Sequence, residues 1–282
     1  MGHKDLIQKY ITPLQPILTD MEPAGHLRAP VKAVLFDVYG TLFVSRSGDI
    51  SIAKQEAQTG AQLASLIQAY EYPGSADDLI DAFSKAIQSS HEAMRRRGID
   101  YPEVQIDEIW QQVLEASDIE KACRFAVEFE MIVNPGYPMP YLESVLSAFR
   151  DSPMVMGIVS NAQFFTPILF QTLLGALPEN IGFEANLVLY SYQHGVAKPS
   201  RRLFQLAAEE LKVHGIAPKE TVYVGNDMLN DMLPAYVEGF QTALFAGDKR
   251  SLRRREDDPR CQGISPDLVI TDLRQLVKQV LK

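Results

Sequence analysis

An acidic residue stands directly after an apolar stretch near the start of the chain. Residues 31–36 read Val-Lys-Ala-Val-Leu-Phe, a composition typical of a strand buried on both faces of a parallel sheet. Asp37 follows at once, and Gly40 comes three residues later, where it permits a tight turn. Parallel sheets bind ligands at the carboxyl ends of their strands, so Asp37 is a candidate reactive carboxylate. A structural Asx turn explains this stretch equally well.

Three more polar stretches follow apolar runs further along the chain. They are Ser160-Asn161, Lys198-Pro199 and Gly225-Asn226-Asp227, with Asp231 four residues beyond Asp227. Each has an ordinary explanation by itself: a serine turn, an exposed lysine, or acids at a helix N-terminus. Four such stretches, each at the end of a strand, favour one shared site. Asp227 and Asp231 are spaced by one helical turn, so they can face one cation together.

Strand and helix patterns alternate from residue 141 to the end of the chain. Strands are expected at 154–160, 187–191, 221–224, 242–245 and 268–270. Helices are expected at 141–150, 164–174, 201–212, 228–237 and 273–280. This alternation predicts an α/β fold with a doubly wound parallel sheet. The connection Asp248–Pro266 carries charges of both signs and is expected to be a solvated surface loop.

The stretch between the first strand and this alternating region is helical. Residues 46–140 show helical periodicity and no convincing strand. Ser75 and Asp78 form a variant of the capping box, and Trp110 is expected in a seam between helices. The expected helices run from Ile52 and Ala53 to 70, from 75 to 97, from 104 to 116 and from 119 to 132. Four helices of this size predict a small bundle.

The sequence also predicts where one part of the chain gives way to the next. Residues 1–30 are expected to form a surface strap with no catalytic part, because prolines forbid a long helix after the short one at 4–10. Residues 134–140, Asn-Pro-Gly-Tyr-Pro-Met-Pro, indicate a stiff linker. The expected α/β core therefore comprises 31–45 with 141–282, and the helical insert comprises 46–140.

Bulk composition narrows the class of protein. The chain has 282 residues, of which 46% are hydrophobic and 22% charged, as is usual for a globular protein. A formal net charge of −9 argues against nucleic acid or an anionic membrane as a partner and leaves a small-molecule substrate. Two cysteines, Cys123 and Cys261, suit a reducing compartment. No apolar run is long enough to span a bilayer and no secretory signal pattern is present, so a cytoplasmic location is expected.

Taken together, the four polar stretches resemble the motifs of the haloacid dehalogenase-like (HAD) hydrolase superfamily. The first motif reads Phe-Asp-Val-Tyr-Gly-Thr-Leu over residues 36–42, and the others are the three stretches quoted above. The resemblance covers residues 31–282. It implies a Rossmann-like core, with the helical insert as a four-helix cap domain. It also implies that Asp37 is a nucleophile that forms a covalent aspartyl intermediate.

The resemblance assigns further roles by position. The catalytic residues that it implies are Asp37, Tyr39, Thr41, Ser160, Asn161 and Lys198. The substrate-binding residues that it implies are Ser160, Asn161 and Lys198, with Arg46 from the cap as a further candidate. The Mg²⁺ ligands that it implies are Asp37, the carbonyl of Tyr39, Asp227 and Asp231.

The superfamily contains phosphatases and 2-haloacid dehalogenases, and this sequence carries signs of both. Phosphatases usually have an aspartate two residues after the nucleophile, as general acid and base, whereas Tyr39 matches the dehalogenases. Dehalogenases usually have a tyrosine where this chain has Phe204 and an arginine in the early part of the cap, yet no arginine lies between Arg46 and Arg95. The pair of acids after the strand at 221–224 is phosphatase-like.

Electrostatics favours the phosphatase alternative. Bringing a carboxylate to a phosphate dianion costs roughly 4 kcal/mol per pair of unit charges at 4 Å and an effective dielectric constant of 20. Oxygen ligands for Mg²⁺ and a fixed lysine would offset that repulsion, whereas displacing halide from a neutral carbon needs no metal. The sequence therefore predicts a Mg²⁺-dependent phosphohydrolase of a small phosphorylated metabolite. The alternatives are a metal-independent 2-haloacid dehalogenase and a catalytically weak binding or regulatory relative.

Overall fold

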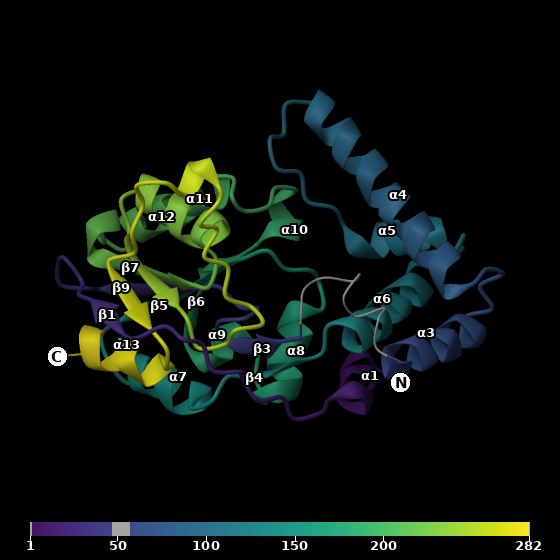
Figure 1. Ribbon diagram of the computed structural model, residues 1–282, viewed down its shortest axis with the longest axis horizontal. Coiled ribbons are helices and arrows are strands. Elements are labelled where there is room, and N and C mark those ends of the chain that lie inside the picture. The colour runs from purple at the N-terminus through teal and green to yellow at the C-terminus, as the bar shows by residue number, and fades with distance from the viewer. Residues whose placement is uncertain (1, 47–56, 282) are drawn as a thin grey trace.

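A seven-stranded sheet organises the molecule. The computed structural model describes residues 2–46 and 57–281, and its sheet has the strand order β1-β9-β8-β7-β2-β5-β6 (Figure 1). The strands are β1 (Ala24–Gly25), β2 (Ala33–Phe36), β5 (Val155–Ser160), β6 (Phe183–Tyr190), β7 (Thr221–Gly225), β8 (Gln241–Phe245) and β9 (Leu268–Ile270). All neighbours are parallel except β1 with β9. The predicted parallel sheet is confirmed, with β2 between β5 and β7.

Helices cover both faces of the sheet because the side chains of β2 alternate between two apolar clusters. Val34 and Phe36 belong to the cluster with α7 (Leu142–Arg150), α8 (Thr166–Leu173) and α13 (Leu273–Val280). Ala33 and Leu35 belong to the cluster with α11 (Arg202–Val213) and α12 (Leu233–Val237). The shorter helices are α9 (Pro178–Ile181), α10 (Ser191–His194), η1 (Pro218–Glu220), η2 (Met228–Met232) and η3 (Pro259–Cys261). Successive side chains of β2 are therefore buried on opposite faces of the sheet, as expected for the central strand of a doubly wound core.

A separate group of helices lies beside the core (Figure 1). Its members are α3 (Ala57–Ala69), α4 (Ala76–Arg96), α5 (Ile106–Val113) and α6 (Ile119–Val133). They enclose their own apolar cluster, in which the Trp110 ring stacks on Phe83 at a centroid distance of 4.2 Å. The capping box is present, since Asp78 N–H donates to Ser75 Oγ at 3.2 Å and Ser75 N–H donates to Asp78 Oδ2 at 2.9 Å. Ile52 and Ala53, expected in the first helix, lie outside the described residues.

A two-stranded ribbon joins the helical insert to the core. Its strands are β3 (Phe43–Ser45) and β4 (Gly136–Pro138), paired antiparallel. The stiff linker predicted at 134–140 joins the two parts here, but its strand was not predicted. Prolines argue against a strand in the middle of a sheet, but a ribbon of two strands has free edges that tolerate them. Ser45 Oγ donates to Asn134 Oδ1 at 2.7 Å, and Asn134 Nδ2 donates to Glu130 Oε1 at 2.9 Å.

Glu130, next to this ribbon, is expected to make stability depend on pH. Burial raises the pKa of Glu130 to about 7. A carboxyl with a raised folded-state pKa contributes stability below its unfolded pKa, and that contribution is lost as pH rises through the folded value. Replacing Glu130 by Gln should therefore raise the melting temperature relative to wild type more at about pH 8 than at about pH 5. Thermal melts of Glu108→Gln, an exposed matched change on α5, should show no such divergence.

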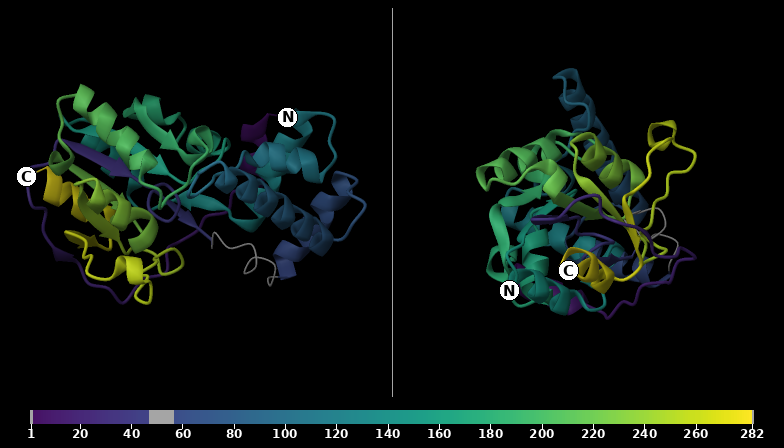
Figure 2. Two further views of the ribbon diagram at one scale, coloured as in Figure 1. Left: turned by 90° about the horizontal axis from the view of Figure 1, so that it is seen from above. Right: turned by 90° about the vertical axis from the view of Figure 1, so that its left-hand side faces the viewer.

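The N-terminal segment contacts both parts of the molecule. Helix α1 (His3–Tyr10) packs on α6 and α8, and Tyr10 OH donates to Glu128 Oε2 at 2.6 Å. Further along, β1 adds an antiparallel strand to the sheet edge, at the other end of the molecule from α1 (Figure 2). The expected strap is present, but its short edge strand was missed. No helix in the described ranges combines the length and apolar content needed to cross a membrane.

The charged connection Asp248–Pro266 lies at the surface with most of its charged run exposed, as predicted, but its first residue and part of its backbone are anchored to the core. Asp248 is only 1% exposed and its Oδ1 accepts a hydrogen bond from Ile17 N–H at 3.0 Å. Ser251 O accepts from Asn226 Nδ2 at 3.0 Å, which places the loop on the end of β7. The alternating charges were read as a solvated pattern, but some of them pair inward with the carboxylates at the sheet edge.

Candidate active site

The predicted site residues converge at the carboxyl edge of the sheet. Asp37 follows β2, Ser160 ends β5 and Asp227 follows β7, so that neighbouring parallel strands bring them together. Asp37 and Asp227 border a cavity of about 250 Å³. The side chains that line it belong to Asp37, Tyr39, Ser45, Asn161, Lys198, Asn226, Asp227, Asn230, Asp231, Ser251 and Arg253.

Asp37 has one oxygen held and one open. Its Oδ1 accepts hydrogen bonds from Ser160 Oγ at 2.8 Å and from Lys198 Nζ at 2.7 Å. Its backbone N–H donates to Val224 O at 2.9 Å, which ties the turn to β7. Oδ2 accepts no hydrogen bond from residues 2–46 or 57–281, and the side chain borders the cavity. A carboxylate held in this way presents one oxygen for nucleophilic attack.

Lys198 is a buried cation between two carboxylates. Its Nζ donates to Asp37 Oδ1 at 2.7 Å and to Asp231 Oδ1 at 2.6 Å, and lies 3.1 Å from Tyr223 OH. Burial acts to lower the pKa of Lys198, but Asp231 and Asp37 outweigh it and raise the pKa above its ordinary value. Burial raises the pKa of Asp231 to about 6 even though Lys198 opposes that shift. The lysine thus stays charged and holds two acids that would otherwise repel each other.

Asn161 connects the second and third motifs. Its Oδ1 accepts from Lys198 N–H at 2.7 Å and its Nδ2 donates to Lys198 O at 3.3 Å. Both bonds go to the backbone of Lys198, so the Asn161 amide fixes the backbone that carries the buried lysine side chain. Asn161 therefore positions Lys198 besides lining the cavity.

Asp231 supports the loop after β7 through its second oxygen. Oδ2 accepts from Asn226 N–H and from Asp227 N–H, both at 2.9 Å. Gly225 makes this approach possible, because a Cβ at that position would lie 2.4 Å from Asp231 Cγ. Both oxygens of Asp231 are therefore engaged by protein donors.

Asp227 is also fully engaged, but by a residue that the sequence reasoning placed in solvent. Its Oδ1 accepts from Arg255 Nε at 3.1 Å and from Leu229 N–H at 2.8 Å. Its Oδ2 accepts from Arg255 Nη2 at 2.6 Å and from Asn230 Nδ2 at 3.0 Å. Of the expected Mg²⁺ ligands, the carbonyl of Tyr39 accepts from Asn226 Nδ2 at 3.4 Å, and only Asp37 Oδ2 has no donor among the described residues. As they lie here, these residues do not fit a Mg²⁺ ligand shell, which needs several free oxygens.

The remaining predicted site residues, Tyr39, Thr41 and Arg46, lie in three different surroundings. Tyr39 OH and Thr166 Oγ1 are 2.9 Å apart, and burial raises the pKa of Tyr39 far above its ordinary value. Thr41 Oγ1 is buried and has no hydrogen-bond partner among the described residues. Arg46 follows β3 and is not among the described residues that line the cavity.

A segment of the helical insert holds the loops that carry Asn161 and Lys198. Glu103 Oε2 accepts from Ser191 Oγ at 2.6 Å, and Glu103 Oε1 accepts from Gln163 Nε2 at 3.1 Å. One residue before Lys198, Ala197 N–H donates to Tyr101 O at 2.7 Å. Sequence reasoning missed this segment because it lies between helices and matches no motif. It also missed Tyr223, although a tyrosine in an otherwise apolar strand is a usable signal.

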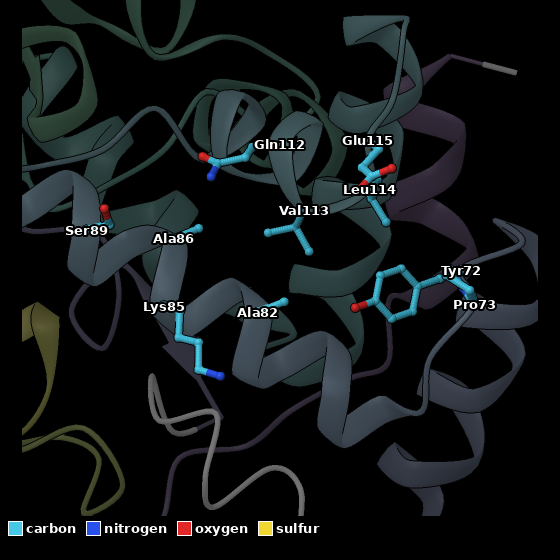
Figure 3. A pocket seen from close by; sticks show the side chains of 10 residues that line it. All are labelled: Tyr72, Pro73, Ala82, Lys85, Ala86, Ser89, Gln112, Val113, Leu114 and Glu115. Carbon is cyan, nitrogen blue, oxygen red and sulfur yellow. The ribbon is translucent and has the colours of Figure 1, made fainter.

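A second cavity lies inside the helical insert and is separate from this site. It has a volume of about 480 Å³ between α4 and α5. Figure 3 shows Tyr72 and Val113 directed toward α4. Lys85 and Gln112 also line this cavity. It shares no lining residue with the cavity at Asp37 and presents no group of carboxylates around a lysine. The reactive groups are thus gathered at the sheet edge.

The fold and the site define a hydrolase class, and comparison with known proteins gives the family. The model of the haloacid dehalogenase-like hydrolase family matches residues 31–235, and a HAD-hydrolase-like model matches residues 195–276. The chain therefore belongs to the haloacid dehalogenase-like hydrolases, as its motifs predicted.

The similar proteins include both a phosphatase and a dehalogenase. A phosphoserine phosphatase of Thermus thermophilus is 30% identical over 141 residues, which are 50% of this chain and 50% of that protein. A 2-haloacid dehalogenase of Pseudomonas syringae is similar in structure, with a TM-score of 0.54 and 19% identity over 89% of this chain and 98% of that one. A HAD-hydrolase of Bacillus subtilis bound to magnesium has a TM-score of 0.51 and 16% identity, over 89% and 99%. At these identities the structural likeness shows the fold alone.

Proposed function

We propose that the chain is a phosphohydrolase that uses Asp37 as a covalent nucleophile on a small phosphorylated metabolite. The observation that carries this proposal is the lining of the cavity at Asp37, where every side chain that residues 2–46 and 57–281 contribute is polar or charged and none of these is aliphatic. A phosphoryl group offers only oxygen acceptors and negative charge to its surroundings. Such a group suits a cavity that is lined by Lys198, Arg253 and three asparagines. The phosphoserine phosphatase relative supports the same substrate class.

The reaction has two displacements at phosphorus. Asp37 Oδ2 attacks the phosphorus, the bond from phosphorus to the ester oxygen breaks, and the alkoxide leaves with a proton from water. Water then attacks the aspartyl-phosphate, which releases inorganic phosphate and restores the carboxylate. Lys198 holds Oδ1, so the free oxygen of Asp37 keeps its direction during attack.

Mg²⁺, the cofactor expected from the sequence, is given no step in this proposal. Asp227 and Asp231 have all of their carboxylate oxygens bonded to protein donors, as described above. The cations at hand are those of the protein itself. The charge on the phosphoryl group is accordingly assigned to Lys198 and to Arg253, which lines the cavity.

Metal-independent 2-haloacid dehalogenation is the second candidate, and Tyr39 is the observation that favours it. This chain carries tyrosine where a phosphatase of the superfamily usually carries its acid and base. The polar cavity lining argues against this candidate, because the carbon chain of a 2-halo acid has no apolar contact there. A weak binding or regulatory relative is the third candidate.

One panel of assays separates the three candidates. Phosphate release from acetyl phosphate and p-nitrophenyl phosphate is measured beside halide release from 2-chloropropionate, each with and without a chelator. Phosphate release alone supports the proposal, whereas halide release alone supports dehalogenation. Absence of turnover with every substrate would support the weak relative. Loss of phosphate release on chelation would return Mg²⁺ to the mechanism.

Tyr39 is expected to limit the rate with alkyl phosphates. Its hydroxyl is paired with Thr166 and its pKa is raised, so it cannot take a proton from the attacking water. Without a positioned acid–base group the rate is lower by about 10²–10⁴. We therefore expect acyl and aryl phosphates to react faster than alkyl phosphates. Tyr39→Phe should leave phosphate release within about threefold of wild type, since the hydroxyl has no part in the reaction.

The opposite change at this position tests the same point. Tyr39→Asp introduces a carboxyl of suitable pKa near the cavity and should raise steady-state phosphate release from an alkyl phosphate. It should leave halide release, if any, no higher than before. A variant that lost halide release and gained nothing toward phosphate esters would favour the dehalogenase instead.

A further inference from the structure

The ion pair between Asp227 and Arg255 is a two-bond contact at the sheet edge, beside the reactive group. The guanidinium donates two roughly parallel bonds, Nε to Oδ1 at 3.1 Å and Nη2 to Oδ2 at 2.6 Å. Asp227 is 6% exposed, while the arginine side chain remains 37% exposed. Two-bond pairs of this kind combine charge with a fixed direction. Asp227 is held in the place that the family resemblance assigns to a metal ligand.

The backbone on both sides brings this arginine to the acid. Arg253 N–H donates to Asn226 O, and Met228 N–H donates to Arg253 O, each at 2.9 Å. These two bonds lay the loop beside the segment that follows β7. Arg255 itself has a φ of 52°, in the left-handed region that a residue with a Cβ seldom adopts. The surrounding contacts hold this conformation in place, and it directs the side chain back onto Asp227.

In the part of the chain that the structure describes, each of the three carboxylates at this edge faces a basic side chain of the protein. Asp37 and Asp231 face Lys198, and Asp227 faces Arg255. Arg253 lines the cavity as well. Three carboxylates therefore stand beside three basic side chains. A divalent cation at Asp227 would have to displace a guanidinium and would then lie close to an unpaired positive charge.

We propose that Arg255, by its two bonds to the carboxylate, keeps Asp227 unavailable to divalent metal ions. This inference concerns the cation requirement of the site, and its meaning for turnover rests on the proposed function. Removing the guanidinium should leave Asp227 Oδ1 bonded to the N–H groups of Leu229 and Asn230, and Oδ2 bonded only to Asn230 Nδ2. Oδ2 then has an acceptor position available for a cation. The chain without Arg255 should then acquire a Mg²⁺ site that the wild type lacks.

Calorimetric titration with MgCl₂ tests the inference without any substrate. Arg255→Gln is expected to bind Mg²⁺ at least about tenfold more tightly than wild type, a difference of about 1.4 kcal/mol. Arg254→Gln is the matched control, because it removes the same charge from the neighbouring residue, which pairs with Glu256. That control should bind Mg²⁺ as weakly as wild type. Adding Asp227→Asn to Arg255→Gln should abolish the gain.

Two results would overturn the inference. One is an equal Mg²⁺ affinity in wild type and in Arg255→Gln, with both proteins folded by thermal melting. The other is saturable Mg²⁺ binding by wild type that is lost in Asp227→Asn, which decides the question even if Arg255→Gln fails to fold. A failure of the phosphohydrolase proposal appears separately, as absence of phosphate release while the binding pattern holds.

Discussion

Asp37→Asn is expected to lower turnover by on the order of 10⁴-fold or more, whichever group leaves. The amide keeps the shape of the side chain but cannot form the acyl-phosphate or the ester intermediate. Its Oδ1 can still accept from Ser160 Oγ and Lys198 Nζ, at the distances of 2.8 Å and 2.7 Å seen for the carboxylate. Steady-state rates of phosphate and halide release, each measured on the same preparation, give the ratio of wild-type to variant turnover.

A control variant must show whether turnover falls because the nucleophile is gone or because the fold is damaged. Asp81→Asn makes the same substitution at an exposed position of α4, away from the cavity, and should leave turnover unchanged. Both variants should melt close to wild type. Substantial residual activity in Asp37→Asn would exclude a covalent mechanism at this residue.

Lys198→Met is expected to destabilise the protein by about 3–5 kcal/mol, because it leaves two buried carboxylates without their cation. The loss should be larger at high pH. Burial already raises the pKa of Asp231 to about 6, and without Lys198 that pKa rises further. A carboxyl with a raised folded-state pKa weakens the fold as pH increases through that value. Urea unfolding at about pH 5 and about pH 8 measures the difference.

Catalysis should be lost together with this stability. The variant no longer orients Asp37 Oδ1 and offers less positive charge to the phosphoryl group. Lys212→Met, which removes an exposed lysine at the end of α11, should alter neither turnover nor the pH dependence of unfolding. Equal losses of stability at both pH values would mean that packing, and not charge, accounts for the role of Lys198.

The residues at the carboxyl edge of the sheet could be predicted from the sequence because each of them lies in a short, recognisable motif. Asp37 and Asn161 directly follow strands whose composition is readable, and Lys198 lies in the connection after β6. Parallel pairing necessarily brings those strand ends together. Asp37, Ser160, Asn161 and Lys198 were predicted in this way and lie together in the structure. What each of them does in a reaction remains a prediction that the variants above test.

The partners of these residues were not readable, since they depend on contacts between distant segments. Arg255 was read as part of a solvated charge pattern, and only the path of its loop shows that it meets Asp227. Glu103 lies between helices, where nothing local indicates that it will accept from Ser191. Strands β1, β3 and β4 have only two or three residues each, too few for periodicity to reveal.

Helix α1 has a consequence for the order in which the chain can complete its fold during synthesis. Tyr10 meets Glu128, 118 residues later, and the His3 ring contacts Phe164 of the segment before α8. Translation at about 5–20 residues per second separates Tyr10 from Glu128 by roughly 6–24 s. During that interval Leu6 and Ile7, both buried in the finished protein, have no partner on α6 or α8. A nascent chain therefore carries an exposed apolar helix turn until the helical insert and the first half of the core have left the ribosome.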